Sequence, residues 1–164
     1  RQLERAARST RRTLNQPIAV LPLVRRLADS LTRLYADHNL AVTVDGDQLV
    51  SVRVDARDLM ELCGNLMDNA AKYGNGKMHV YVEHGEPGSR EPGVLITIAD
   101  NGPGIPHERF RQLLQRGVRD DERQEGQGLG LAIAQQLVEA YGGRLELHRS
   151  ELGGAAVRIV LPPR

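Results

Sequence analysis

Apolar and polar positions in the first half of the chain follow two different periods. Residues 20–37 carry apolar side chains at helical spacing, which predicts a helix with one face on a core. Residues 40–45 and 49–54 alternate with period two around a turn signal at 45–47, which predicts short strands. An acid at the start of residues 55–73 caps a second predicted helix.

The second half of the chain is richer in strand patterns. Residues 78–83 and 94–98 alternate and flank a glycine-bearing loop, so they predict an antiparallel hairpin. Two helices are expected at 106–114 and 129–140, and two closing strands at 144–148 and 155–161. Helices mixed with mostly hairpin-linked strands favour an α+β fold, with the helices on one face of a mixed sheet.

Composition narrows the function classes. The 164 residues suffice for one domain with a core, and 40% apolar with 26% charged residues is typical of a soluble globular protein. Trp is absent, Phe110 is the only Phe, and the net charge is +1. Neither stacking platforms nor a global positive field are present, so nucleic acid is not an expected partner.

The chain also carries signs of being a piece of a larger protein. It begins without Met in a helical, arginine-rich stretch, and we interpret residues 1–16 as a helix end or linker. No apolar run of membrane-spanning length and no signal peptide is visible, which says little about the parent protein. Cys63, the sole cysteine, lies in an apolar helical pattern and is expected to be a buried, inert thiol.

The most informative motif is residues 100–105, Asp-Asn-Gly-Pro-Gly-Ile. An acid ends an apolar strand, and the two glycines after it let backbone approach a ligand closely while the carboxylate points into the gap. The alternative interpretation is an ordinary surface turn.

A second signal lies on the helix predicted at 55–73. At about 100° per residue, Glu61, Asn65, Asn69 and Lys72 fall within an arc of roughly 80°. Asparagine is a poor helix former, but its amide oxygen suits a hard cation, and a lysine meets phosphate as a point charge. The alternative is a solvated polar face.

A third signal is the glycine-rich stretch at 126–131, which follows a charged loop at 116–128 and opens a helix. Backbone N–H groups at a helix N-terminus bind phosphate, and glycine removes side chains that would block it. The spacing G-x-G-x-G is not the dinucleotide fingerprint, and a glycine-rich hinge is the alternative.

These three segments occur in an order that resembles the catalytic ATP-binding domain of sensor histidine kinases, within the ATPase group that includes gyrase, Hsp90 and MutL. Residues 61–73 resemble the family's N box, 100–105 and 126–131 its two glycine boxes, and 152–155 its terminal glycine motif. The resemblance covers 17–162, and the short lid resembles that of the PhoQ type. It implies a two-layer α/β sandwich of the Bergerat type, with 17–164 as the catalytic domain and 1–16 as the end of a dimerisation helix.

The resemblance also implies roles for particular residues. Asp100 would accept a hydrogen bond from the adenine amino group, with Gly102, Gly104 and Ile105 around the base. Asn69 and Asn65 would hold Mg²⁺ on the phosphates of ATP, and Lys72 and Tyr73 would contact phosphate and nucleoside. The remaining implied phosphate contacts are Gly128, Leu129, Gly130, Leu131 and, in the lid, Arg119 and Gln127.

Two departures from the family pattern stand out. The segment around Phe110 lacks the usual aromatic pair, and Leu113-Leu114 is the candidate substitute in packing. Glu61 occupies the place where related ATPases carry a base that activates water, and either a catalytic or an orienting role is open for it. The candidate catalytic residues are therefore Glu61, Asn65, Lys72 and Arg119. None of the five histidines has the context of a phosphoacceptor.

The leading interpretation is the ATP-binding module of a two-component sensor kinase, which passes the γ-phosphoryl group to a histidine outside this chain. Its partners would be its own dimerisation domain and a response regulator. The fragment is expected to be monomeric and cytoplasmic, within a homodimeric parent anchored in the bacterial inner membrane. The alternatives are a stand-alone ATPase or anti-sigma factor type serine kinase of the same superfamily, and a non-catalytic nucleotide-binding module.

Overall fold

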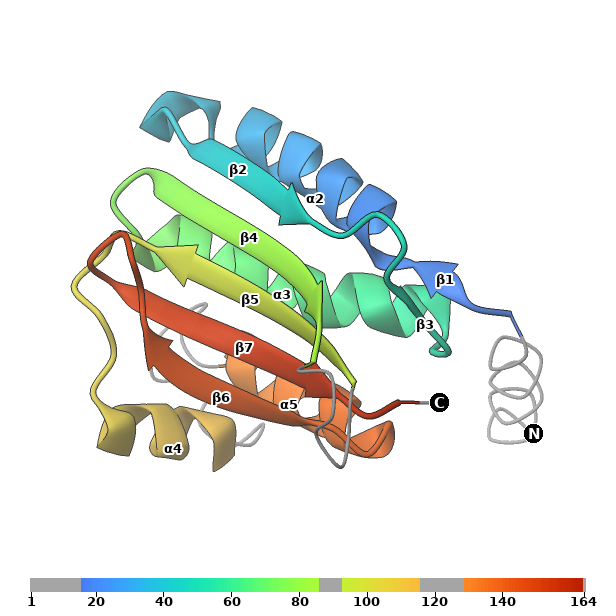
Figure 1. Ribbon diagram of the computed structural model, residues 1–164. Coiled ribbons are helices and arrows are strands. Elements are labelled where there is room, and N and C mark those ends of the chain that lie inside the picture. The colour runs from blue at the N-terminus through green and yellow to red at the C-terminus, as the bar shows by residue number, and fades with distance from the viewer. Residues whose placement is uncertain (1–15, 86–92, 116–128, 164) are drawn as a thin grey trace, which may run out of the picture.

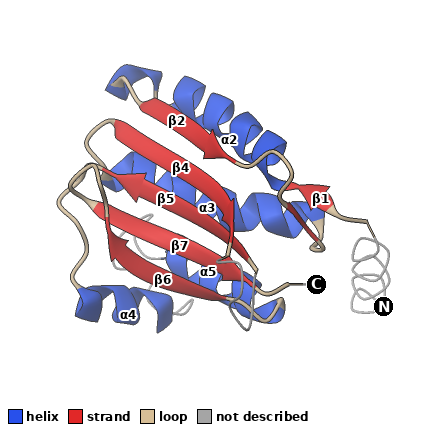
Figure 2. Ribbon diagram, in the orientation of Figure 1, coloured by secondary structure: helices blue, strands red, loops and turns tan. Residues whose placement is uncertain are grey.

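The computed structural model describes residues 16–85, 93–115 and 129–163, which form two layers (Figure 1). One layer is a five-stranded sheet in the order β2-β4-β5-β7-β6, and α2, α3 and α5 cover its rear face as drawn (Figures 1 and 2). The strands are β2 (Ala41–Gly46), β4 (Lys77–His84), β5 (Val94–Asp100), β6 (Arg144–Arg149) and β7 (Ala155–Leu161). The helices are α2 (Val20–Leu34), α3 (Ala56–Tyr73), α4 (His107–Gln115) and α5 (Leu129–Ala140). The predicted α+β fold is confirmed.

Strand pairing follows the alternation of the sequence. The predicted hairpin is β4 with β5, in a register that runs from Met78 opposite Asp100 to His84 opposite Val94. β7 pairs antiparallel with both β5 and β6, whereas β2 runs parallel to β4. A parallel pair needs a long crossover connection, and α3 lies within the one between β2 and β4. The sheet is therefore mixed but mostly antiparallel, as expected.

The two strand patterns that flank the turn signal at 45–47 do not pair with each other. Pairing with β4 continues past β2, since the Asp47 N–H donates to the Val82 carbonyl at 3.0 Å. Only Ser51–Val52 (β3) forms a strand after the turn, and it pairs with β1 (Ile18–Ala19) in a separate two-stranded sheet. Strand alternation is a local signal, and it does not say which partner a strand will choose.

Helix boundaries agree with the capping signals. The Asp55 side chain accepts a hydrogen bond from the Arg57 N–H at 2.7 Å, so it is the N-cap of α3. After α5, Gly142 adopts φ 77° and the Gly143 N–H donates to the Val138 carbonyl at 2.9 Å. The helix predicted over 20–37 is shorter, because α2 ends at Leu34 and a 3₁₀ turn (Ala36–His38) follows it.

The core lies between the sheet and the helices. β4 contributes Met78, Val80 and Val82 to it, on the face opposite its polar side chains. α3 contributes an apolar stripe made of Leu59, Leu62, Cys63, Leu66, Met67 and Ala70. Cys63 is buried, as expected, and burial raises the pKa of its thiol to about 12, which fits an inert cysteine. Among the described residues, no helix has the length and apolar character needed to cross a bilayer.

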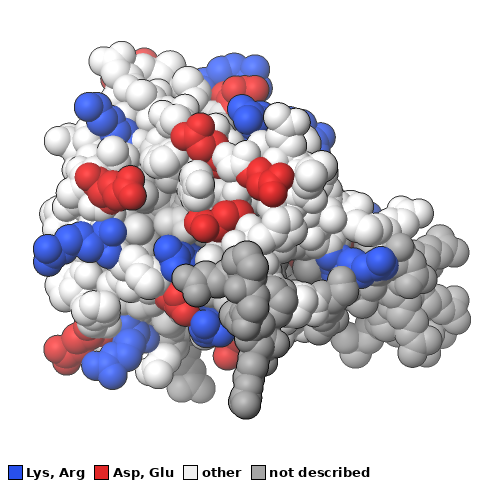
Figure 3. Space-filling view, viewed as in Figure 1, with Lys and Arg blue, Asp and Glu red and all other residues white. Residues whose placement is uncertain are grey.

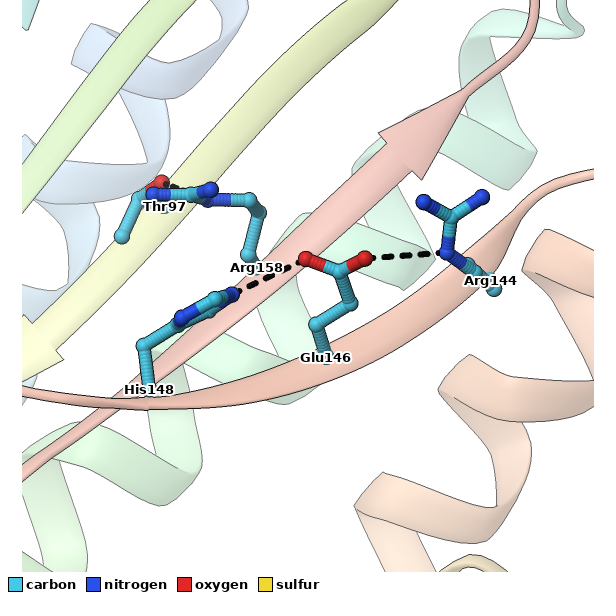
Figure 4. Close-up of polar contacts among 5 residues, drawn as sticks. All are labelled: Thr97, Arg144, Glu146, His148 and Arg158. Atoms are coloured by element: carbon cyan, nitrogen blue, oxygen red, sulfur yellow. Dashed lines mark hydrogen bonds and ion pairs between the residues drawn. The ribbon is translucent and has the colours of Figure 1, made fainter.

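The outer face of the sheet is polar. Figure 3 shows acidic and basic side chains interspersed over it, and Figure 4 shows the contacts that Glu146 makes there. The Glu146 carboxylate accepts from Arg144 Nε at 2.9 Å and lies 2.9 Å from His148 Nε2. These contacts, chiefly the hydrogen bond with His148, lower the pKa of Glu146 below its ordinary value of 4.5 despite its partial burial.

We expect Glu146→Gln to reduce the free energy of unfolding by no more than about 1 kcal/mol near neutral pH, because the cluster is partly exposed. A depressed carboxylate pKa stabilises the fold above the unfolded-state pKa, and this contribution is lost as pH falls through the lower folded-state value. The difference between wild type and variant in urea unfolding should therefore shrink as the pH falls below the ordinary carboxylate pKa and disappear once Glu146 is protonated in both states. Glu83→Gln is the control, since Glu83 has no ion pair among the described residues. A difference that grows on acidification would contradict the assignment.

Candidate functional site

A cavity of about 220 Å³ opens between α3, the end of β5 and the helices α4 and α5. Its walls are mostly apolar, with four polar or charged side chains, Asn69, Tyr73, Asp100 and Arg109. The other lining residues are Leu66, Ala70, Ile98, Pro103, Gly104, Ile105, Pro106, Leu113, Leu131, Ala155 and Val157. An apolar pocket with a few convergent polar groups is the usual form of a small-molecule site.

Asp100 is the buried acid of this cavity. It ends β5 and is only 9% exposed. Its Oδ1 accepts from the Gly102 N–H at 2.8 Å and from the Ala155 N–H at 3.3 Å, which leaves Oδ2 to accept from a ligand. Burial raises the pKa of Asp100, and the two backbone hydrogen bonds act in the opposite direction. The carboxylate is thus fixed in place with one oxygen available.

The glycines beside Asp100 make room for close backbone packing. A Cβ on Gly154 would lie 2.2 Å from Asp100 Oδ1, and one on Gly102 would lie 2.3 Å from the Tyr73 carbonyl oxygen. Gly154 also donates its N–H to the Asp100 carbonyl at 3.1 Å. Gly104 has φ 85°, a conformation that favours glycine, and a Cβ there would meet open space. The acid-glycine turn is therefore packed between the end of α3 and the β6–β7 turn.

Asn101 holds the other side of the same turn, a role that the sequence interpretation missed. Its Oδ1 accepts from the N–H groups of Asn75 and Lys77 at 2.8 and 3.0 Å, and its Nδ2 donates to the Asn75 carbonyl at 3.1 Å. An asparagine directly after a buried acid is a common turn residue, so only the tertiary contact distinguishes this one.

The asparagines of α3 face the start of α5. A Cβ on Gly130 would lie 3.4 Å from Asn69 Oδ1 and 3.5 Å from the Asn65 backbone oxygen. Asn65 Nδ2 is buried without a hydrogen-bond partner in the described structure. An orphaned buried amide N–H is uncommon in folded proteins, and as a donor it fits an acceptor on a ligand, such as a phosphate oxygen.

These groups also fit a divalent cation bound together with phosphate. The described residues hold no cluster of three or more His, Cys, Asp or Glu side chains that could form a cation cage. Two amide side chains supply neutral oxygen ligands, and Mg²⁺ in nucleotide sites takes most of its remaining ligands from phosphates and water. Asn69 lies at the cavity wall and Asn65 one turn before it.

The cavity joins six of the predicted binding residues: Asn69, Tyr73, Asp100, Gly104, Ile105 and Leu131. Gly102 supports the turn, Gly130 packs on Asn69, and Leu129 begins α5. Glu61 and Lys72 are exposed on α3 and do not line the cavity; Lys72 Nζ lies 3.3 Å from Asp68 Oδ2. Arg119, Gln127 and Gly128 lie outside the described residues.

Helix α4 contributes side chains that the sequence interpretation did not place at the site. Arg109 lines the cavity and adds a positive charge to its wall. Leu113 lines it too and is buried with Phe110, which agrees with the expectation that Leu113 takes part in packing where the family has an aromatic pair. The apolar positions of α4 are visible in the sequence, but their neighbours are not.

Comparison with protein families and curated sequences identifies relatives of this chain. The family model described as "Histidine kinase-, DNA gyrase B-, and HSP90-like ATPase" matches residues 54–164. The two-component sensor PhoQ of Pseudomonas aeruginosa is 38% identical over 158 residues, which are 96% of this chain and 34% of that protein. The sensor protein kinase CarS of the same organism is 39% identical over 136 residues, 83% of this chain and 29% of CarS. The chain thus spans about a third of the length of these curated relatives.

Solved structures show the same fold. The ATP binding domain of PrrB from Mycobacterium tuberculosis superposes with a TM-score of 0.73 at 27% identity, covering 90% of this chain and 96% of that one. A mycobacterial sensor histidine kinase, MprB, gives a TM-score of 0.71 at 30% identity, covering 91% and 97%. The relatives are sensor kinases, so a stand-alone serine kinase is not favoured. The chain therefore belongs to the histidine kinase-, DNA gyrase B- and HSP90-like ATPase family, as an ATP-binding domain of the sensor histidine kinase type.

Proposed function

We propose that this domain binds Mg-ATP and that the full-length protein transfers the γ-phosphoryl group to a histidine on a dimerisation domain outside this chain. The observation that carries the proposal is the buried Asp100 carboxylate, which has one unpaired oxygen at a cavity that also reaches the asparagine face of α3. This arrangement offers a base-binding end and a phosphate-binding end within one site.

The base-binding end is formed by β5, its glycine turn and the apolar cavity walls. Asp100 Oδ2 accepts the adenine amino hydrogen, because an ionised carboxylate only accepts. Ile105 and Leu131 offer apolar contacts to the faces of the ring from opposite elements. The three supports of Asp100, namely Gly102, Ala155 and the close packing at Gly154, keep its orientation fixed before the nucleotide arrives.

The phosphate-binding end is formed by α3 and the start of α5. We assign Asn65 and Asn69 to the cation on the phosphates, with Lys72 and Tyr73 as contacts to phosphate and nucleoside. The backbone N–H groups of Gly128, Leu129, Gly130 and Leu131, at and before the start of α5, suit phosphate oxygens. Arg119 and Gln127 are further candidates for the terminal phosphates. When bound, Mg²⁺ neutralises charge that develops on the phosphates.

Catalysis in such a site rests on positioning and charge neutralisation. The histidine nitrogen attacks the γ-phosphorus, the new N–P bond forms as the β–γ bridging P–O bond breaks, and ADP leaves with the bridging oxygen. A neutral imidazole carries its own lone pair and requires no base to activate water. Glu61, exposed on α3 one turn before Asn65, is kept as a candidate for orientation or proton acceptance. No described histidine lines the cavity, which fits an acceptor supplied from elsewhere.

The wider assembly belongs to the same proposal. Residues 1–16 are assigned to the end of a dimerisation helix or linker, and residues 17–164 to the catalytic domain. A response regulator would receive the phosphoryl group in turn. The parent is proposed to be a membrane-anchored homodimer with this domain in the cytoplasm, by analogy with the sensor kinases it resembles.

Asp100→Asn is expected to weaken binding of ATP and adenosine alike by roughly 10- to 100-fold, the range for a hydrogen bond to a charged group. The new amide must accept from Gly102 and Ala155 with its oxygen, which directs its NH₂ at the adenine amino group. Titration with a fluorescent nucleotide measures the effect. Asp45→Asn, on the outer face of the sheet, is the matched control and should bind as wild type does. Failure of the wild-type domain to bind ATP in the presence of Mg²⁺ would refute the proposed function.

Gly154→Ala should abolish adenosine binding and lower stability by at least about 1–3 kcal/mol, because the new methyl overlaps Asp100 Oδ1 and lies 2.6 Å from the Gly102 nitrogen. Gly64→Ala, on α3, is the control. Its methyl would lie 3.7 Å from the Leu27 side chain, and alanine is a better helix former than glycine. Thermal unfolding and adenosine titration of both variants test this. Wild-type adenosine affinity in Gly154→Ala would mean that the packing around Asp100 does not matter for the base.

Phosphoryl transfer can be tested by adding the parent's isolated dimerisation-helix domain to this domain with γ-labelled Mg-ATP. We expect label on the helix domain in an acid-labile, alkali-stable form, as phosphohistidine chemistry requires. Label that survives acid would instead indicate a serine or threonine acceptor and would contradict the histidine kinase assignment.

A further inference from the structure

We propose that Tyr35 and Asp68 act together as positioning residues for Lys72, orienting its ammonium group toward the phosphates of the nucleotide. The inference rests on the proposed function, because it assumes that Lys72 contacts phosphate. It adds two residues outside the predicted site, one of them at the end of a different helix.

The contacts form a chain from α2 to the phosphate-binding end of α3. Tyr35 directly follows α2 and donates its hydroxyl hydrogen to Asp68 Oδ1 at 2.7 Å. The second carboxylate oxygen, Oδ2, lies 3.3 Å from Lys72 Nζ. The two oxygens of one carboxylate are therefore divided between Tyr35, at the end of α2, and the ammonium group of Lys72.

Helix geometry places this chain on the flank of the asparagine stripe. At about 100° per residue, Asp68 lies roughly 60° from Asn65 on the side away from Asn69, and Lys72 lies between them. Gly64, one turn before Asp68, faces Leu27 of α2, so this flank is the one turned toward α2. Tyr35 thus reaches Asp68 from the helix that packs beside it.

The Tyr35 contact distinguishes this arrangement from an ordinary surface ion pair. The side chains of Lys72 and Asp68 are 39% and 34% exposed, and an i,i+4 ion pair of that kind contributes little by itself. Tyr35, however, is half-buried, and burial together with the neighbouring Asp68 raises its pKa to about 12. The hydroxyl remains protonated and continues to donate, which holds the carboxylate in one orientation.

A fixed carboxylate is useful to a lysine that must meet phosphate. The lysine side chain loses rotamer freedom when it is held in one place, and a pre-formed contact removes part of that loss from the binding step. An ammonium group has three donors, so contact with Asp68 leaves others for phosphate oxygens. Protein kinases use the same principle when a glutamate orients the lysine that contacts ATP phosphates.

The sharpest variant is Tyr35→Phe, because it removes the anchor without changing any charge. We expect it to weaken ATP binding about three- to tenfold, less than the full value of a hydrogen bond to a charged group because the contact acts on ATP only through Lys72, and to leave adenosine binding unchanged. In a Lys72→Met background the same substitution should have no effect on ATP. Tyr81→Phe, an exposed tyrosine on the outer face of the sheet, is the control. Fluorescent-nucleotide competition with ATP and adenosine measures all four proteins and the double variant.

Three outcomes would overturn this inference while leaving the proposed function intact. ATP affinity of Tyr35→Phe could equal that of wild type, adenosine binding could fall as much as ATP binding, or the loss could persist in the Lys72→Met background. The second would show a general structural role, and the third a route that does not pass through Lys72. Absence of Mg-ATP binding by the wild-type domain would instead refute the proposed function itself.

Discussion

The burial of the Asp100 carboxylate is the constraint on which the site depends. A buried acid is costly unless backbone donors satisfy it, and here two N–H groups from different segments do so. One comes from the turn that follows the acid and the other from the start of β7, 55 residues further along the chain. Asp100 Oδ1 therefore links the glycine turn to β7, and its two hydrogen bonds fix the direction in which Oδ2 points. Gly154 must be a glycine because this arrangement leaves no space for a methyl group.

Helix α3 lies between that acid and the rest of the molecule, and each of its faces contacts a different part of the structure. Its apolar stripe is buried against the sheet and the other helices, and Asn69 and Tyr73 turn to the cavity. On the flank toward α2, Asp68 binds both Tyr35 and Lys72. A single rigid helix thus places the proposed phosphate contacts relative to the base end. Its rigidity comes from packing on two sides, since two asparagines and a glycine weaken its intrinsic helix propensity.

Much of this could be predicted from local patterns. Hydrophobic periodicity located the principal helices and the hairpin of β4 and β5, and the caps at Asp55 and Gly142-Gly143 marked helix ends to within a residue or so. The parallel pairing of β2 with β4 was not predicted, because a period-two pattern defines the face of a strand but not its neighbour. Asn101 and Arg109 were missed for a related reason: each has an ordinary local context and acquires its place through contacts with distant segments.

The sequence by itself determined the family, because an acid before paired glycines, a helical asparagine stripe and a glycine-opened helix stand along the chain in the order that the family shows. It did so through short-range spacing, which fixes the face of an element and the freedom of a turn. Only the tertiary structure decided which side chains meet: that Asp100 is held by Ala155, that Lys72 is paired with Asp68, and that Tyr35 reaches across from α2. Such contacts depend on how the layers pack, and packing is a property of the whole chain.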